Sequence, residues 1–120
     1  AKIISVATVN DDPLLVLSGC ILATQKILSQ NNLKVSDVDL FEIHEAFAST
    51  MIHCQKELKI DDAKLNVNGG CIALGHPMGA TGSIMMSTLI DELERQNLST
   101  GIVATSGAAG AGTAMLVERI

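Results

Sequence analysis

A histidine lies in a loop that the sequence makes both tight and rigid. The stretch 69–82 holds five glycines, one proline and His76 in fourteen residues. Glycine permits positive backbone angles and close approach of a ligand, whereas Pro77 fixes its own φ and keeps His76 out of the helical region. Imidazole is the side chain best suited to proton transfer near neutral pH. The pattern favours a general base at His76, and the alternative is a structural histidine that caps the following helix.

Two further clusters could take part in such chemistry. His44, in the segment His44-Glu45-Ala46-Phe47, is expected where a strand ends and a helix begins, a position at which α/β folds bind ligands. The helix dipole disfavours imidazolium there, so His44 is predicted to be either a neutral hydrogen-bond donor or a helix cap. The small residues of 106–112 offer backbone amides that suit an oxyanion, and they equally suit a tight turn between strands.

Several other kinds of site are excluded because their motifs are missing. The chain has no HExxH of zinc proteases, no Gly-Lys-Ser/Thr of a P-loop and no GxSxG elbow around Ser106. Cys20, Cys54 and Cys71 are an odd number without CxxC spacing, so neither a disulfide framework nor a metal site is expected. We expect all three to be buried small side chains in a reducing compartment, either cytoplasm or mitochondrion.

Composition limits the class of partner. Of the 120 residues 48% are apolar, only two are aromatic, and the formal net charge is −5. One domain over residues 1–120 is expected, with a core of aliphatic side chains and methionine. The basic residues are scattered and no aromatic platform accompanies them, so nucleic-acid binding is not expected. No apolar run reaches membrane-spanning length, and Asn10, Asp11 and Asp12 interrupt any signal peptide, so no membrane partner is expected.

The elements that must position these clusters follow from apolar spacing and from helix-start and turn residues. Four strands are expected at 2–8, 39–43, 101–105 and 112–118, together with an extended segment at 65–68. Helices are expected from Pro13 to about Gln30, over 45–59 and over 80–96. The order β-α-β-α-β-α-β-β predicts an α/β fold, a mixed sheet with helices on its faces, whose last two strands are antiparallel neighbours.

Taken together and in this order, the clusters resemble the C-terminal domain of the thiolases over essentially the whole chain. The most specific element is the stretch 69–82, Gly-Gly-Cys-Ile-Ala-Leu-Gly-His-Pro-Met-Gly-Ala-Thr-Gly. The segments 66–70 and 113–116 look most like acetyl-CoA acetyltransferases, whereas His44 before Glu-Ala-Phe looks more like the long-chain 3-ketoacyl-CoA thiolases. The fold implied by the resemblance is one half of the thiolase fold.

The resemblance implies an acyltransferase that catalyses the reversible Claisen condensation of two acetyl-CoA to acetoacetyl-CoA and CoA, or thiolysis of 3-ketoacyl-CoA. His76 would activate a nucleophilic cysteine, and His44 would help to build an oxyanion hole through a water. Ser106 would occupy the position of a proton-shuttling cysteine. The residues expected to contact the coenzyme A thioester are Gly75, Gly107, Ala108 and Phe47. No cofactor beyond these thioesters is implied, and a homo-oligomer is expected for the full-length protein.

Two departures from the family pattern limit this interpretation. The N-terminal thiolase half, which carries the nucleophilic cysteine, is not in this sequence, so we expect the isolated domain to be inactive. Ser106 replaces a thiol by a far less acidic hydroxyl, and loss of an acid/base group costs about a hundredfold to ten-thousandfold in rate. With serine at this position, the full-length protein is expected to be a weak thiolase, an enzyme of thioester hydrolysis or decarboxylative condensation, a Cys-to-Ser variant, or a non-catalytic subunit that binds acyl-CoA or a partner.

Overall fold

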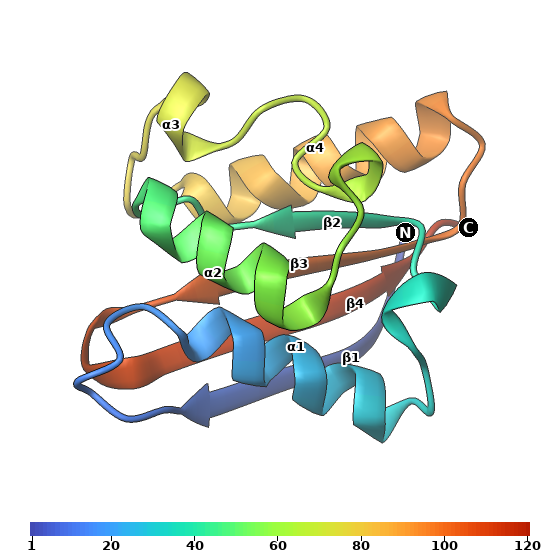
Figure 1. Ribbon diagram of the computed structural model, residues 1–120. Coiled ribbons are helices and arrows are strands. Elements are labelled where there is room, and N and C mark those ends of the chain that lie inside the picture. Colours follow the sequence, from blue (N-terminus) through green and yellow to red (C-terminus); the bar gives the residue numbers. More distant parts are fainter.

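The computed structural model describes residues 1–120, which form four strands and four α-helices (Figure 1). In chain order the elements are β1 (Lys2–Asn10), α1 (Gly19–Gln30), β2 (Leu40–Ile43), α2 (Ala48–Leu58), α3 (Cys71–Leu74), α4 (Thr81–Arg95), β3 (Thr100–Ser106) and β4 (Ala111–Glu118). Short 3-10 turns lie at Val35–Asp37, Asp62–Lys64 and Ala108–Gly110. None of the helices has the length and apolar character needed to cross a membrane.

The four strands form one mixed sheet in the order β1-β4-β3-β2. β2 runs parallel to β3, whereas β4 is antiparallel to both β3 and β1. The last two strands are therefore antiparallel neighbours, as predicted, and the α/β class with a mixed sheet is confirmed. Because parallel strands end at the same edge of a sheet, the residues that follow β2 and β3 are brought side by side.

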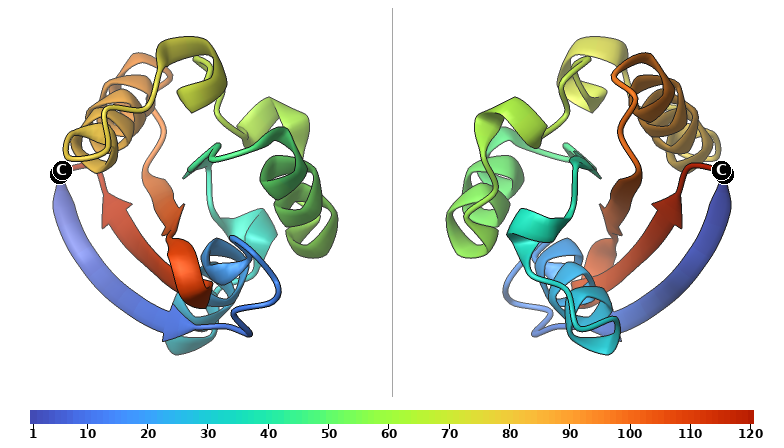
Figure 2. Two further views of the ribbon diagram at one scale, coloured as in Figure 1. Left: turned by 90° about the vertical axis from the view of Figure 1, so that its left-hand side faces the viewer. Right: turned by 90° about the vertical axis from the view of Figure 1, so that its right-hand side faces the viewer.

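Different helices cover the two faces of this curved sheet, as the edge-on views of Figure 2 show. Phe41, Ile43 and Ile102 point toward α1 and α2 and belong to the larger hydrophobic cluster. Leu40 and Val103, which alternate with them along β2 and β3, point toward α4 and a smaller cluster. α4 lies over β2 and β3, whereas α1 packs on β4, β1 and β3. Beyond α4, the same face of β4 and β1 has no helix of this chain over it.

The extended segment predicted at 65–68 is not a strand. Leu65 makes a single parallel bridge to Phe41, and Asn66 then turns the chain with a positive φ of 44°. The Asn66 side chain takes the place of a neighbouring strand, because its Oδ1 accepts from the Ile43 backbone N–H at 2.8 Å and its Nδ2 donates to the Ile43 carbonyl at 2.9 Å. The outer edge of β2 is therefore closed by the Asn66 side-chain amide together with the Asn66 backbone N–H, which donates to the Phe41 carbonyl at 2.8 Å, and no fifth strand forms.

Two helices begin later than predicted. The first was expected to start at Pro13 but starts at Gly19. The acidic side chains before Gly19 accept hydrogen bonds that hold this segment in turns. Asp12 accepts from the Leu14 backbone N–H at 2.9 Å, and Asp11 accepts from the Ser18 hydroxyl at 2.6 Å. Such local hydrogen bonds compete with helix formation. Similarly, α2 begins at Ala48 and not at residue 45, so the residues directly after β2 lie in a loop.

Candidate active site

The structure brings His44, His76 and Ser106 together at one cavity of about 790 Å³. His44 follows the end of β2 and Ser106 is the last residue of β3, so the parallel pairing of these strands makes them neighbours. His76 reaches the same cavity from the glycine-rich loop between α3 and α4. Three segments far apart in the sequence thus supply one concave site at the end of the sheet, where open α/β sheets bind ligands.

The residues predicted to contact a coenzyme A thioester lie in two places. Phe47, Gly107 and Ala108 line the cavity, and Phe47 is 61% exposed. Gly75 does not line it and borders a separate small cavity beneath the glycine loop. The cavity therefore combines a few polar groups with accessible apolar surface that includes Phe47, as ligand pockets commonly do.

His44 is buried and has a lowered pKa. Only 6% of its surface is exposed, and its backbone N–H donates to the Ala104 carbonyl at 2.9 Å. Burial, and next the nearby imidazole of His76, lower the pKa of His44, and the Ser106 carbonyl opposes this shift only in part. Neither ring nitrogen has a hydrogen-bond partner within the chain. His44 is therefore a neutral imidazole with a free N–H donor and a free lone pair.

His76 is exposed, and one of its ring nitrogens is engaged. Its Nδ1 lies 2.7 Å from the Thr81 hydroxyl oxygen, and that hydroxyl donates its single hydrogen to the Pro77 carbonyl at 3.2 Å. Both contacts are satisfied together when the Thr81 oxygen accepts from Nδ1–H, an arrangement that leaves Nε2 unprotonated in the neutral ring. The ring centroids of His76 and His44 are 4.5 Å apart and the planes are inclined by 48°. This tautomer is the one that a base acting through Nε2 requires.

Glu45 holds the glycine loop against the end of β2. One carboxylate oxygen accepts from the Ile72 backbone N–H in α3 at 2.9 Å, and the other accepts from the Asn66 side-chain amide at 2.9 Å. The carboxylate lies where Gly70 has no side chain, since an added Cβ would be 2.6 Å from each oxygen. Sequence reasoning did not assign a role to Glu45 or Asn66, whose contacts join residues far apart in the chain.

The Ser106 hydroxyl is engaged with the start of α1. It donates to the Leu17 carbonyl at 2.9 Å and accepts from the Cys20 backbone N–H at 2.9 Å. This contact depends on a close approach of two backbones, because a Cβ on Gly19 or on Gly112 would overlap the main chain of the other segment. The single hydroxyl hydrogen of Ser106 is therefore donated within the chain, and its oxygen, which already accepts one hydrogen bond, has only one further lone pair for a ligand in the cavity.

The three cysteines differ in environment. Cys20 and Cys54 are fully buried, as predicted, whereas Cys71 is only partly buried, so its prediction was wrong. The neighbouring Cys54 thiol lowers the pKa of Cys20, and the same pairing together with burial raises the pKa of Cys54. Cys71 escapes burial because it opens the one-turn helix α3 on the outside of the molecule. None of the three is in a disulfide.

Comparison of the sequence with known proteins identifies the family to which the chain belongs. The family model described as the thiolase C-terminal domain matches residues 1–119. The chain is 42% identical over 122 residues to a 3-ketoacyl-CoA thiolase of Aliivibrio salmonicida, which covers 99% of this chain and 32% of that protein. It is 41% identical over 120 residues to an acetyl-CoA acetyltransferase of Rhizobium meliloti, covering 100% of this chain and 30% of the relative.

A plant protein matches equally well. The chain is 41% identical over 117 residues to the peroxisomal 3-ketoacyl CoA thiolase 1 of Petunia hybrida, which covers 96% of this chain and 25% of that protein. The chain thus spans about a quarter to a third of the length of these relatives and corresponds to one part of a longer protein. By its sequence, this chain belongs to the thiolase family, as the C-terminal domain.

Proposed function

We propose that this chain is the C-terminal domain of an acyltransferase that condenses two acetyl-CoA to acetoacetyl-CoA and CoA, or cleaves 3-ketoacyl-CoA by the reverse thiolysis. The observation that carries the proposal is the convergence of His44, His76 and Ser106 on one cavity. Each residue type fits a separate task in acyl transfer: activation of a thiol, stabilisation of an oxyanion and a position near the carbon that gains or loses a proton.

His76 is the base in this proposal. In the tautomer that donates Nδ1–H to Thr81, Nε2 carries the lone pair, and the exposed position of the ring leaves Nε2 accessible to a thiol outside this chain. The thiol is a cysteine of the N-terminal half, which becomes acylated after His76 removes its proton. We assign the nucleophile to that half and not to Cys71, so the isolated domain is expected to be inactive.

His44 acts in the proposal as a neutral donor. Its lowered pKa keeps the ring uncharged, and its unpartnered N–H is free to bind the thioester oxygen directly or through a water. A donor that is fixed before the reaction costs no reorganisation when charge develops on that oxygen. The backbone bond to Ala104 and the burial of the ring supply this fixed position.

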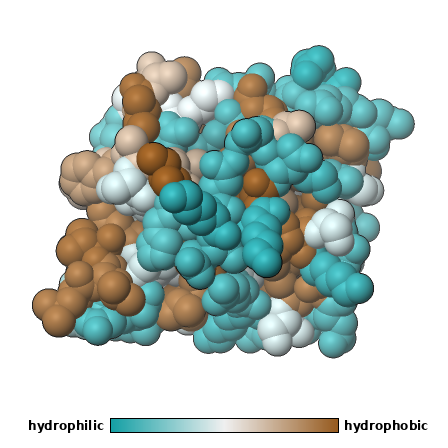
Figure 3. All heavy atoms as spheres, in the orientation of Figure 1, coloured by the Kyte–Doolittle hydropathy of each residue, from teal (hydrophilic) through white to brown (hydrophobic).

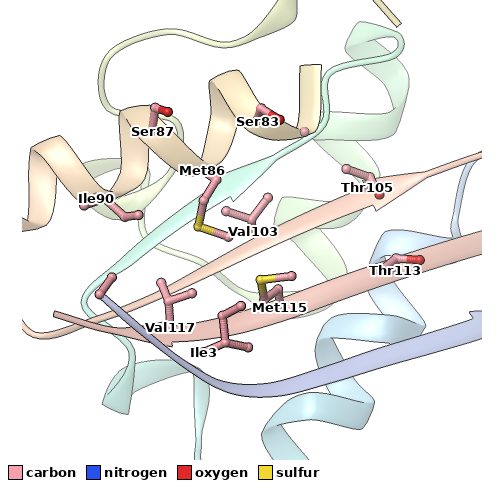
Figure 4. A pocket seen from close by; sticks show the side chains of 12 residues that line it. Ile3, Ser83, Met86, Ser87, Ile90, Val103, Thr105, Thr113, Met115 and Val117 are labelled. Atoms are coloured by element: carbon pink, nitrogen blue, oxygen red, sulfur yellow. The ribbon is translucent and has the colours of Figure 1, made fainter. Parts of the chain in front are cut away.

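The N-terminal half is the partner that we propose for the open face of the sheet. A groove of about 640 Å³ lies between α4 and the strands β1 and β4, and its walls include Met86, Ile90 and Met115 (Figure 4). Large apolar side chains are also exposed at the cavity, where Met78 is 83% exposed, and in the loop before α1, where Leu14 is 85% exposed. Figure 3 shows such side chains gathered over the loop before α1. Contiguous apolar surface of this kind marks an interface, and most of the protein's length lies outside this chain.

A second candidate function is supported by Ser106. Its hydrogen is donated to Leu17, so the residue offers no acid group comparable to a thiol at this position. The second candidate is a thiolase-like subunit that binds an acyl-CoA, or supports a partner, without turnover. The intact arrangement of His76 and Thr81 favours the enzyme, because a pure binding module needs no fixed base.

An assay of the full-length protein with acetoacetyl-CoA and CoA separates the two candidates. The enzyme predicts thiolysis by the native protein, a rise in rate for Ser106→Cys and loss of activity for His76→Ala. Loss of a general base lowers the rate by about a hundredfold to ten-thousandfold. Absence of thiolysis in both the native protein and Ser106→Cys would contradict the enzyme and leave the binding subunit. Turnover by residues 1–120 alone would contradict the assignment of the nucleophile to the N-terminal half.

A further inference from the structure

Three metal-ligating side chains meet beside the cavity. One ring nitrogen of His44, one of His76 and the Sγ of Cys71 all lie within 4.8 Å of one another. We propose that His44, Cys71 and His76 form a binding site for one divalent cation of the zinc class, with a fourth coordination position open to the cavity. The absence of CxxC spacing does not exclude this site, because Cys71 and His76 lie in the stretch 69–82 and His44 lies in a separate segment after β2.

The spacing is close to what tetrahedral coordination demands. Zinc binds nitrogen at about 2.0–2.1 Å and thiolate at about 2.3 Å, which sets the ligand atoms of one ion about 3.3–3.7 Å apart. Rotation of the Cys71 side chain, which is only partly buried, would bring its sulfur closer to the two imidazoles, whereas Thr81 keeps the His76 ring in place. The histidine rings are inclined by 48° with their centroids 4.5 Å apart, so they are not stacked face to face.

The unpartnered ring of His44 is an independent indication of a ligand. Its side chain is more than nine-tenths buried, yet both ring nitrogens lack any hydrogen bond. Buried polar groups are almost always satisfied in folded proteins, and an exception calls for a missing ion, water or functional role. A metal bound by His44 would satisfy one nitrogen with a bond stronger than any hydrogen bond in reach.

The surrounding contacts orient the other two ligands. Metal-bound histidine commonly donates its second N–H to an oxygen that fixes the ring. The Thr81 hydroxyl does this for His76, and it leaves Nε2 as the available ligand. Glu45 accepts from the backbone N–H of Ile72, the residue after Cys71, and so fixes the first turn of α3. Both supporting contacts exist before any ion binds.

The donor set selects the class of ion. Two imidazoles and one thiolate suit zinc and similar borderline-soft cations, whereas magnesium and calcium prefer oxygen ligands. Binding converts the Cys71 thiol to a thiolate and releases its proton to solvent, with no change in oxidation state. Since the ion would occupy both imidazoles that line the cavity, bound metal and catalysis at this cavity exclude each other.

Cobalt titration of the full-length, metal-free protein tests the proposal. Co²⁺ replaces zinc in such sites and gives a thiolate-to-metal charge-transfer absorption when a cysteine is bound. We expect one equivalent of Co²⁺ to produce this absorption, and an excess of zinc but not of magnesium to abolish it. Cys71→Ala should lose the absorption. Its affinity for Co²⁺ should fall by more than the roughly 10–100-fold that follows loss of a residue that only orients a metal ligand.

The matched control is Cys54→Ala, which removes a buried thiol that is not part of the cluster and should retain the absorption. Circular dichroism of each variant confirms that it is folded. The proposal is overturned if the native protein gives no charge-transfer band, or if the band persists unchanged in Cys71→Ala. Because the readout is spectroscopic, its failure is distinct from a failure of the thiolysis assay.

Discussion

Gly70→Ala measures how firmly Glu45 holds the glycine loop. The φ of Gly70 is −123°, which alanine adopts without strain, so the added methyl acts only through the Glu45 carboxylate, 2.6 Å away. The carboxylate must move, and its hydrogen bonds to Asn66 and Ile72 are then lost. A hydrogen bond to a charged group contributes about 1.5–3 kcal/mol, and water compensates in part because Glu45 is half-buried. We expect the free energy of unfolding to fall by about 2–4 kcal/mol.

Urea unfolding of the 120-residue chain, followed by circular dichroism, gives this difference. The control is Gly82→Ala, since a Cβ at Gly82 meets nothing within 4 Å and alanine stabilises a helix by about 0.5–1 kcal/mol. When Glu45 is first replaced by alanine, Gly70→Ala should lower the free energy of unfolding much less, because the two residues act through one contact. An equal cost with and without the Glu45 carboxylate would refute the reasoning.

Two further predictions concern α4. Hydrogen bonds from Arg95, and next from Asn68, hold the pKa of Glu92 at about 2, below its ordinary 4.5. Glu92 therefore stabilises the fold above pH 4.5 and loses this contribution as the pH falls toward 2. In Glu92→Gln the midpoint of urea unfolding should fall less steeply as the pH is lowered over that range. An unchanged pH dependence of the midpoint would contradict this role of Glu92. Thr81→Val should lower kcat of thiolysis in the full-length protein by up to about a hundredfold, because His76 loses its orienting partner. Thr81→Ser should restore the rate, and equal rates in all three proteins would contradict the tautomer assignment.

Strand and helix order could be predicted because it depends on local pattern. The apolar runs of β2 and β3 reflect burial on both faces, and the parallel pairing follows from the helices between them. The segment 65–68 was wrongly predicted as extended because Asn66 replaces a strand through its side chain, which no local pattern signals. The start of α1 was misplaced for a related reason, since the bond between Asp11 and Ser18 forms only in the folded turn.

The candidate site was predictable to a different extent at each residue. His76 has a local signal, because glycines and Pro77 surround it. His44 and Ser106 have weaker local signals, and their place beside His76 depends on the parallel register of β2 and β3. Cys71 carried no signal at all: its approach to the two histidines depends on the single turn of α3, which the spacing of apolar residues did not predict.

The close approach of Gly19 and Gly112 has a consequence for how sequences of this domain can vary. A side chain at either position meets the main chain of the other segment, not a side chain that could shrink in response. No second substitution at the partner position can then relieve the first. The two positions should tolerate no replacement in a deep mutational scan, alone or together, and should show no covariation although they touch. Contact prediction from correlated substitutions would therefore miss the contact between Gly19 and Gly112, which sets the distance between α1 and Ser106.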